Sequence, residues 1–477
     1  TDVLPAVDGG TRAAKSVVDE QFWIQARVFR EGHDAVNATA VLTDPDGVDH
    51  AFPMPSVNVG LSLWNVQVSA ARAGWWTYRV EGWSDPWETW VHDGTIKVEA
   101  GIDEELMLEE GARVVEHALA ALPDSAPASA RTELRDVVTA LRDPNRPPIA
   151  RLRAATAPEV HAIFAAYPFR EKVSPSAAYP LLVERELALF GAWYEIFPRS
   201  EGATKDPVTG TWTSGTFRTA AKRLPAIAAM GFDVVYLTPI HPIGTTARKG
   251  KNNTLVALPG DPGSPYAIGS PDGGHDALHP ELGTFEDFDA FVAEAGRLGM
   301  EVAMDIALQC SPDHPYVATH PEWFTTRADG TIAYAENPPK KYQDIYPINF
   351  DNDPDGMYRE ALRLIEYWVD HGVTIFRVDN PHTKPLEFWD WLTTQVHQTH
   401  PEVIFLAEAF SRPEVMQTLG KAGFHMSYTY FTWRFTKQDL GAYLMELATE
   451  TADFMRPNFF VNTPDINPVS YTHLRAH

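Results

Sequence analysis

Three acidic residues stand at the ends of three apolar runs, and their spacing constrains the fold more than any other feature. They are Asp379 in TIFRVDN, Glu408 in VIFLAEAF and Asp465 in NFFVNTPDIN, and they lie 29 and 57 residues apart. A strand, a helix and two loops occupy about 25–35 residues, so these spacings fit one and two units of a repeating β/α fold. Each acid is therefore predicted at the carboxyl end of a parallel strand, where a (β/α)₈ barrel gathers its functional groups.

From residue 187 onward, apolar runs alternate with helical patterns, which is typical of parallel strands joined by helices. The expected strands are 187–197, 232–240, 300–308, 374–380, 403–410, 425–431 and 458–465. The helical patterns between them include TFRTAAKRLPAIAAMG and GMYREALRLIEYWVDHG. We therefore expect an α/β fold whose catalytic domain, 187–468, is a (β/α)₈ barrel truncated after strand seven, with a loop subdomain at 311–355.

The residues before the barrel predict two further domains. Residues 1–100 contain alternating segments such as FWIQARVF and WWTYRVEGW, separated by turn signals DPDG and SDP, which indicates an N-terminal β-sandwich. Residues 101–186 are rich in Ala, Leu and Glu at helical spacing, which indicates a small helical bundle. The sandwich is interpreted either as a glycan-binding module or as a packing or dimer platform.

Composition restricts the partners. Lys and Arg number 39 against 64 Asp and Glu, a formal charge of −25, so the surface would repel nucleic acid and anionic lipid. The single cysteine, Cys310, excludes an intrachain disulfide and fits a reducing cytosol. There is no apolar run of membrane-spanning length and no apolar core of a signal peptide. The sequence thus predicts a cytoplasmic protein without nucleic acid or membrane partners.

The last nine residues, 469–477, read VSYTHLRAH and continue no predicted element. They are similar to translated adapter sequence, so we expect a non-native tail there and exclude it from fold reasoning. On this interpretation the eighth strand would follow Pro468 in the native protein.

Acidic residues gathered at the carboxyl ends of barrel strands are suited to reactions at the anomeric carbon of a sugar. Such chemistry needs a nucleophile, a proton donor and a group that stabilises positive charge on the sugar ring. The histidines show no metal-ligand spacing such as HExxH, and the chain has no phosphate-binding loop and no dinucleotide fingerprint. No metal and no cofactor are expected.

The segment 187–467 resembles the α-amylase superfamily of glycoside hydrolases and transglycosylases (glycoside hydrolase family 13). The resemblance rests on GTFEDFDAFVAEAGRLGMEVAMDI, FRVDN, FLAEAF and the acid of the fourth region. It implies that Asp379 is the nucleophile, Glu408 the acid/base and Asp465 the transition-state stabiliser. Arg377 matches the arginine that holds the nucleophile.

Departures from the amylase pattern narrow the match. Gln309-Cys310 replaces the usual Asn-His after strand three, and Pro464 stands where a His usually precedes the third acid. The motifs DIALQCSPDHP, NPPKKYQDIYP, FRVDNPHTKP and LAEAFSRP resemble the bacterial maltosyltransferases that extend α-1,4-glucan from maltose-1-phosphate. This resemblance covers nearly the whole chain up to Pro468.

The resemblance implies a retaining transfer of maltosyl units from α-maltose-1-phosphate to the non-reducing end of α-1,4-glucan, with release of phosphate, by a homodimer. The residues that it places around the substrate carry groups able to hydrogen-bond sugar or phosphate. They are Lys249, Gln309, Asp344, Asn380, Arg377, Asn337, Lys340 and Tyr342.

Two other functions stay open at this point. An α-amylase-type hydrolase of plain glucan shares the acid triad but normally carries the Asn-His and His-Asp pairs that this chain lacks. A non-enzymatic glycan-binding or assembly protein would use the sandwich and the bundle as interaction surfaces. The three intact acids favour an enzyme over this last reading.

Overall fold

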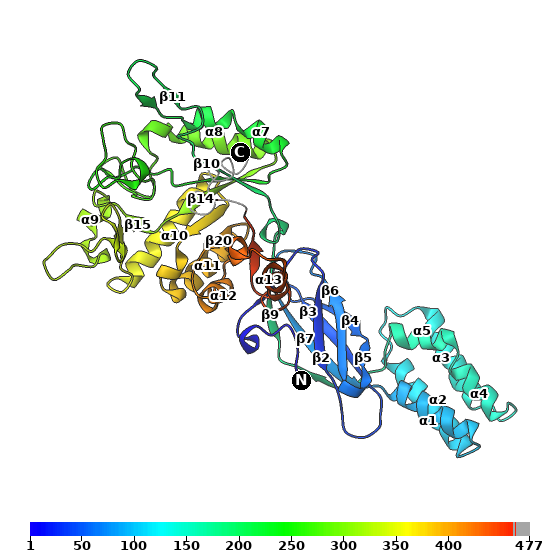
Figure 1. Cartoon of the computed structure of the whole chain (residues 1–477). Coiled ribbons are helices and arrows are strands. Elements are labelled where there is room, and N and C mark those ends of the chain that lie inside the picture. Colours follow the sequence, from blue (N-terminus) through cyan, green and yellow to red (C-terminus); the bar gives the residue numbers. More distant parts are fainter. Residues whose placement is uncertain (461–462, 464–477) are drawn as a thin grey trace. The chain divides into compact units, whose positions relative to one another are not determined.

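The computed structural model describes residues 1–460 and 463, and the chain divides into two compact units. The first comprises Thr1–Ala14 and Asp19–Leu182, and the second comprises Lys15–Val18 and the chain from Val183 onward. Figure 1 follows both along the sequence, from blue to red. No helix among the described residues has the length and apolar character needed to cross a membrane.

The first unit contains two β-sheets, and buried positions alternate along residues 22–27 and along most of 74–84. In one, β3 (Val36–Thr43) pairs with β4 (Asp49–Met54) and β7 (Gly74–Ser84), and β7 also borders β8 (Glu171–Pro175) and β9 (Tyr179–Glu184). In the other, β6 (Leu63–Val68) lies between β2 (Phe22–Arg27) and β5 (Ser56–Asn58).

The DPDG turn signal joins β3 to β4 as expected. The amide of Gly47 donates to the carbonyl oxygen of Asp44 at 2.9 Å, and Gly47 has a φ of 81°. Glycine adopts this left-handed conformation without a steric penalty.

The helical segment begins earlier than the sequence boundary at residue 101. It comprises α1 (Pro86–Glu99), α2 (Glu104–Ala121), α3 (Ala128–Leu141), α4 (Pro148–Ala155) and α5 (Pro158–Ala166). Asp85 caps α1 by accepting the amide of Glu88 at 2.9 Å, and Pro86 takes the first helical position. The SDP signal thus starts a helix rather than a turn between strands.

The residues after the bundle also differ from expectation. Residues 171–184, assigned to the bundle from the sequence, form β8 and β9 and join the sheet next to β7. The bundle is therefore an insertion between strands of one sheet. Its own core includes Trp87 stacked on Phe164 with ring centroids 4.0 Å apart.

The second unit confirms six of the predicted barrel strands in shorter form, and its seventh strand overlaps the predicted range 458–465 only at Asn458. Seven strands of the described residues lie in sequence order, and each pairs with the next in parallel. They are β10 (Trp193–Ile196), β13 (Val234–Leu237), β14 (Glu301–Ile306), β19 (Ile375–Asp379), β20 (Ile404–Glu408), β21 (Met426–Tyr428) and β22 (Arg456–Asn458). Over the described residues this is a (β/α)₈ barrel that stops after strand seven.

Helices connect successive strands. They are α6 (Phe217–Ala221), α7 (Leu224–Ala229), α8 (Phe285–Arg297), α10 (Pro354–Asp370), α11 (Leu386–Thr399), α12 (Pro413–Lys421) and α13 (Lys437–Thr449). The first expected helix is divided in two because Pro225, near the start of α7, has no amide hydrogen and clashes with the preceding turn. α8 begins with a capping box between Thr284 and Asp287.

The insertion after β14 forms small hairpins. β15 (Gln309–Cys310) pairs with β18 (Tyr346–Pro347), and β16 (Ala335–Asn337) pairs with β17 (Lys340–Tyr342). The β16–β17 hairpin lies between β15 and β18 in the chain, and a short helix, α9 (Pro315–Thr319), precedes it.

Residues Lys15–Val18 of the N-terminal segment belong to the barrel unit. The amide of Lys15 donates to the carbonyl oxygen of Asp453 at 2.8 Å, and Arg456 donates to the carbonyl oxygen of Lys15 at 3.1 Å. The Lys15 ammonium also donates to the carbonyl oxygen of Phe424. Sequence patterns gave no indication of this docking.

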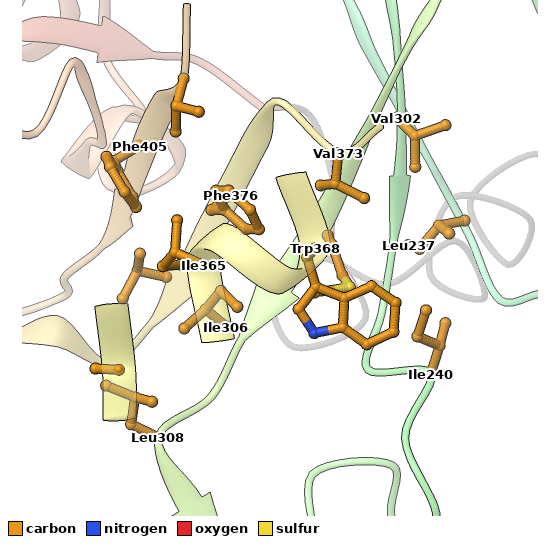
Figure 2. Packing of buried hydrophobic residues seen from close by; sticks show 14 of the residues in the cluster. Leu237, Ile240, Val302, Ile306, Leu308, Ile365, Trp368, Val373, Phe376 and Phe405 are labelled. Atoms are coloured by element: carbon orange, nitrogen blue, oxygen red, sulfur yellow. The ribbon is translucent and has the colours of Figure 1, made fainter. Parts of the chain in front are cut away.

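The outer face of the barrel sheet is covered by helix side chains. Figure 2 shows Ile365 and Trp368 of α10 against strand residues that include Ile306 and Phe376. Trp368 is completely buried, and its indole N–H donates to the carbonyl oxygen of His275 at 2.9 Å.

Replacing Trp368 with alanine should strongly destabilise the barrel unit. The change leaves a large cavity and an unpaired carbonyl group, so we expect the free energy of unfolding to fall by about 3–5 kcal/mol. Urea denaturation followed by circular dichroism measures it. Trp212→Ala is the matched control, because Trp212 is exposed and such changes usually alter stability by about 0.5 kcal/mol or less. Equal losses in both variants would contradict the packing role.

Candidate active site

Two of the predicted acids lie side by side at the carboxyl ends of adjacent strands. Asp379 ends β19, Glu408 ends β20, and the two residues are direct partners in the parallel register. Neighbouring strands lie about 4.8 Å apart, so the two side chains leave the sheet next to each other. Both residues are buried. The strand-end placement predicted for these two acids is thus present in the fold.

One guanidinium group connects the acids. Arg377, also on β19, donates through Nη1 to Oδ1 of Asp379 at 3.0 Å, and its Nη2 lies 3.3 Å from Oε1 of Glu408. The same Nη1 lies 3.0 Å from Oδ2 of Asp305 on β14. The rings of Tyr236 and Tyr428 flank the guanidinium carbon, with centroids 5.9 and 5.6 Å away.

Asp305 is a central residue that the sequence analysis did not select. It is fully buried and accepts hydrogen bonds from the hydroxyl groups of Tyr236 at 2.6 Å and Tyr266 at 2.9 Å. Burial raises the pKa of Asp305 to about 6, although Arg377 opposes this shift. The sequence feature that could have identified Asp305 is its place as an acidic residue inside the apolar segment MEVAMDIAL.

Glu408 has the protonation behaviour of a proton donor near neutral pH. Burial raises its pKa to about 7; the positive charge of Arg377 lowers it, and the negative charge of Asp379 raises it. Its Oε2 also accepts the backbone N–H of Asn380 at 3.2 Å. Both protonation states of Glu408 are therefore populated around pH 7.

Asn380 bridges the two acids. It adopts a left-handed backbone conformation with a φ of 44°, which asparagine tolerates better than most residues. Its amide nitrogen Nδ2 donates to Oδ2 of Asp379 at 3.4 Å, while its backbone N–H reaches Glu408. The side chain is exposed and available to a ligand.

The other residues placed around the substrate form separate groups. Gln309 donates to the carbonyl oxygen of Tyr266 at 3.2 Å, so it supports the tyrosine that contacts Asp305. Lys249 and Asp344 are both buried, with Nζ and Oδ1 3.9 Å apart, and burial raises the pKa of Asp344. Lys249 also donates to Gln343 at 3.0 Å.

Three more of the residues expected around the substrate lie on the β16–β17 hairpin. Asn337 is the direct partner of Lys340 in the antiparallel register, and both are exposed, while Tyr342 is half-buried at the end of β17. Within the described residues, no hydrogen bond or ion pair connects these three side chains to Asp379 or Glu408. The third predicted acid, Asp465, and the predicted tail at 469–477 lie outside the described residues.

A buried group of possible metal ligands, His275, Cys310 and His314, lies beside the barrel. The ring nitrogens of the two histidines already have partners. Nδ1 of His314 accepts from Tyr316, Nε2 of His314 lies 3.0 Å from Nδ1 of His275, and Nε2 of His275 lies 2.9 Å from the carbonyl oxygen of Ala307. Two neutral rings with their hydrogens on Nε2 satisfy all these contacts.

Comparison with known proteins decides the family. The chain is 60% identical over 466 residues to α-1,4-glucan:maltose-1-phosphate maltosyltransferase 1 of Streptomyces coelicolor. The aligned region covers 98% of this chain and 68% of that relative. The chain belongs to the α-1,4-glucan:maltose-1-phosphate maltosyltransferase family. The correspondingly named protein of Mycobacterium tuberculosis strain H37Rv is 50% identical over 492 residues, covering 98% of this chain and 69% of its own length.

The model of this maltosyltransferase family's domain N/S matches residues 1–185. Among solved structures, an α-amylase from Lactobacillus plantarum is similar with 27% identity and a TM-score of 0.43, covering 54% of this chain and 60% of its own.

Removing the charge of Asp379 should lower the pKa of Glu408. The negative charge of Asp379 disfavours ionisation of Glu408, so Asp379→Asn should move the titration midpoint of Glu408 below about 7. The infrared carbonyl band of protonated Glu408, isolated by subtracting the spectrum of Glu408→Gln in the same background, reports the midpoint.

The matched control is Asp289→Asn. Asp289 on α8 is half-exposed and pairs with His371, the residue that follows α10. Removing its charge should leave the titration midpoint of Glu408 unchanged. A midpoint that stays in place, or rises, in Asp379→Asn would show that the two carboxyl groups do not interact as described.

Proposed function

We propose that this chain is the maltosyltransferase that its relatives' name describes. It would move maltosyl units from α-maltose-1-phosphate to the non-reducing end of α-1,4-glucan and release phosphate. Identity of 60% over nearly the whole chain supports the activity. The observation that carries the mechanism is the pairing of Asp379 and Glu408 at adjacent strand ends around Arg377.

In the first step, Asp379 acts as the nucleophile. Its carboxylate attacks the anomeric carbon, the bond from that carbon to the phosphate oxygen breaks, and a β-linked maltosyl ester forms while phosphate departs. Nη1 of Arg377 lies 3.0 Å from Oδ1 and holds this carboxylate in place. Retention needs two carboxyl groups about 5–5.5 Å apart, a spacing that neighbouring strands provide.

In the second step, Glu408 acts as the base. It removes the proton of the acceptor 4-hydroxyl, whose oxygen attacks the anomeric carbon and displaces the carboxylate of Asp379. An α-1,4 bond results and the nucleophile is regenerated. A carboxyl group with a pKa of about 7 suits both the donation and the removal of a proton near neutral pH. We assign to Asp465 the stabilisation of positive charge on the ring, following the family pattern.

The remaining assignments concern the donor. Lys249, Gln309, Asp344 and Asn380 are proposed to contact the donor. Lys340, Lys341, Tyr342 and Asn380 are proposed for its phosphate, and Asn337 for the substrate. The exposed cation of Lys340 on a hairpin of the βα loop supports the phosphate role in a protein with a net charge of −25. The reaction as written needs no cofactor. A homodimer is proposed from the family resemblance, and a cytoplasmic location from the single cysteine.

The activity is tested by incubating the chain with α-maltose-1-phosphate and a maltooligosaccharide. Released phosphate and products longer by two glucose units are expected. Asp379→Ala should abolish both, and Glu408→Gln should lower the rate by about 10²–10⁴-fold. Phosphate assays and mass spectrometry measure the two outcomes, with Asp289→Asn as the active control.

Maltose released from the donor without any longer product would contradict the transfer. Cleavage of plain glucan in the absence of the phosphate donor would instead support the amylase-type hydrolase.

A further inference from the structure

The turn that follows the nucleophile strand is tied down by a lysine with no role in the assignments above. Nζ of Lys384 donates to the carbonyl oxygens of Asp379 at 3.4 Å and Asn380 at 3.3 Å. The carbonyl of Asn380 also accepts the hydroxyl of Thr383 at 2.8 Å. Lys384 follows the one-turn helix η7 (Pro381–Thr383), so the lysine folds back over the turn that it terminates.

This turn sets the geometry of both acids. Asn380 holds its left-handed φ of 44° while its backbone N–H contacts Glu408 and its side chain contacts Asp379. A non-glycine residue in this region needs support from its surroundings. The ammonium group of Lys384 gives that support by donating to the carbonyl oxygens of Asp379 and Asn380, which lie on either side of the Asn380 N–H along the backbone.

The charge of the lysine acts on the same acids. The charged and titratable groups facing it are Asp305 on β14, Arg377 and Asp379 on β19, Glu408 on β20 and His382 in its own turn. Without Lys384, three carboxyl groups share the single positive charge of Arg377. Burial lowers the pKa of Lys384, while the three carboxyl groups oppose that shift and favour the ammonium form.

We propose that Lys384 is a positioning residue of the transfer reaction: it fixes the left-handed turn at Asn380 and supplies the second positive charge beside Asp379 and Glu408. This rests on the proposed function and deepens it. Lys384 itself need not touch the substrate, because it acts through the backbone of the two residues before η7.

Four variants separate the two contributions. Lys384→Met removes both the charge and the hydrogen bonds, and Lys384→Gln removes the charge but keeps a donor. Lys384→Arg keeps the charge and a donor. Thr383→Ala is the matched control, because it removes a neutral hydrogen bond to the same carbonyl of Asn380. Thermal melting checks that each variant folds.

The first readout is the infrared titration of Glu408, which does not depend on turnover. Lys384→Met and Lys384→Gln should both move the midpoint upward from about 7, because a cation that favours the carboxylate is gone. Lys384→Arg and Thr383→Ala should leave it in place. An unchanged midpoint in the two neutral variants, or an equal shift in Thr383→Ala, overturns the electrostatic part.

The second readout is the rate of transfer. Lys384→Met should lower kcat by about tenfold to a hundredfold, as expected when reacting groups are displaced slightly, with little change in KM. Lys384→Arg should restore most of the rate, and Lys384→Gln should fall between them. A kcat unaffected in Lys384→Met overturns the positioning part. If the unmodified chain releases no phosphate, the proposed function fails, whereas the titration still decides the effect of Lys384 on Glu408.

Discussion

A single buried guanidinium group holds the carboxyl ends of three neighbouring strands together. Arg377 contacts Asp305 on β14, Asp379 on its own strand and Glu408 on β20. Its planar fork presents donors in several directions, which a lysine ammonium at the same place would not do. Removing one member of a buried ionic group usually costs about 3–5 kcal/mol, because the others are left without compensation. The arrangement of Asp379 and Glu408 and the integrity of the sheet edge therefore depend on the same contacts.

The parts of the fold that local pattern determines were predictable. Seven apolar runs became seven parallel strands because strands buried on both faces need continuous apolar sequence. The parts that depend on pairing between segments far apart in the sequence could not be predicted. Residues 171–184 contain Pro175 and Pro180, which argue against a helix, but nothing local indicates that they pair beside β7. SDP is ambiguous in principle, since Asp before Pro suits both a turn and the start of a helix.

The residues of the candidate site also divide into those that could be predicted from the sequence and those that could not. Asp379 and Glu408 could be located because the end of a strand is visible in the sequence. Asp305 was missed because its importance lies in its partners, two tyrosine hydroxyls and an arginine that come from other elements. Gln309 reaches the centre only through the backbone of Tyr266. The pairing of Lys249 with Asp344 joins two loops, and no spacing rule connects them.

The docking of Lys15–Val18 onto the barrel has a consequence for biosynthesis. During synthesis these residues emerge long before their partners, because Phe424 lies 409 residues and Arg456 lies 441 residues further along the chain. Until those partners emerge, the segment cannot make these hydrogen bonds. Closing so long a loop late in folding is slow compared with forming local helices. These contacts are therefore expected to form late, after the strands and helices that lie between Val18 and Phe424 in the chain.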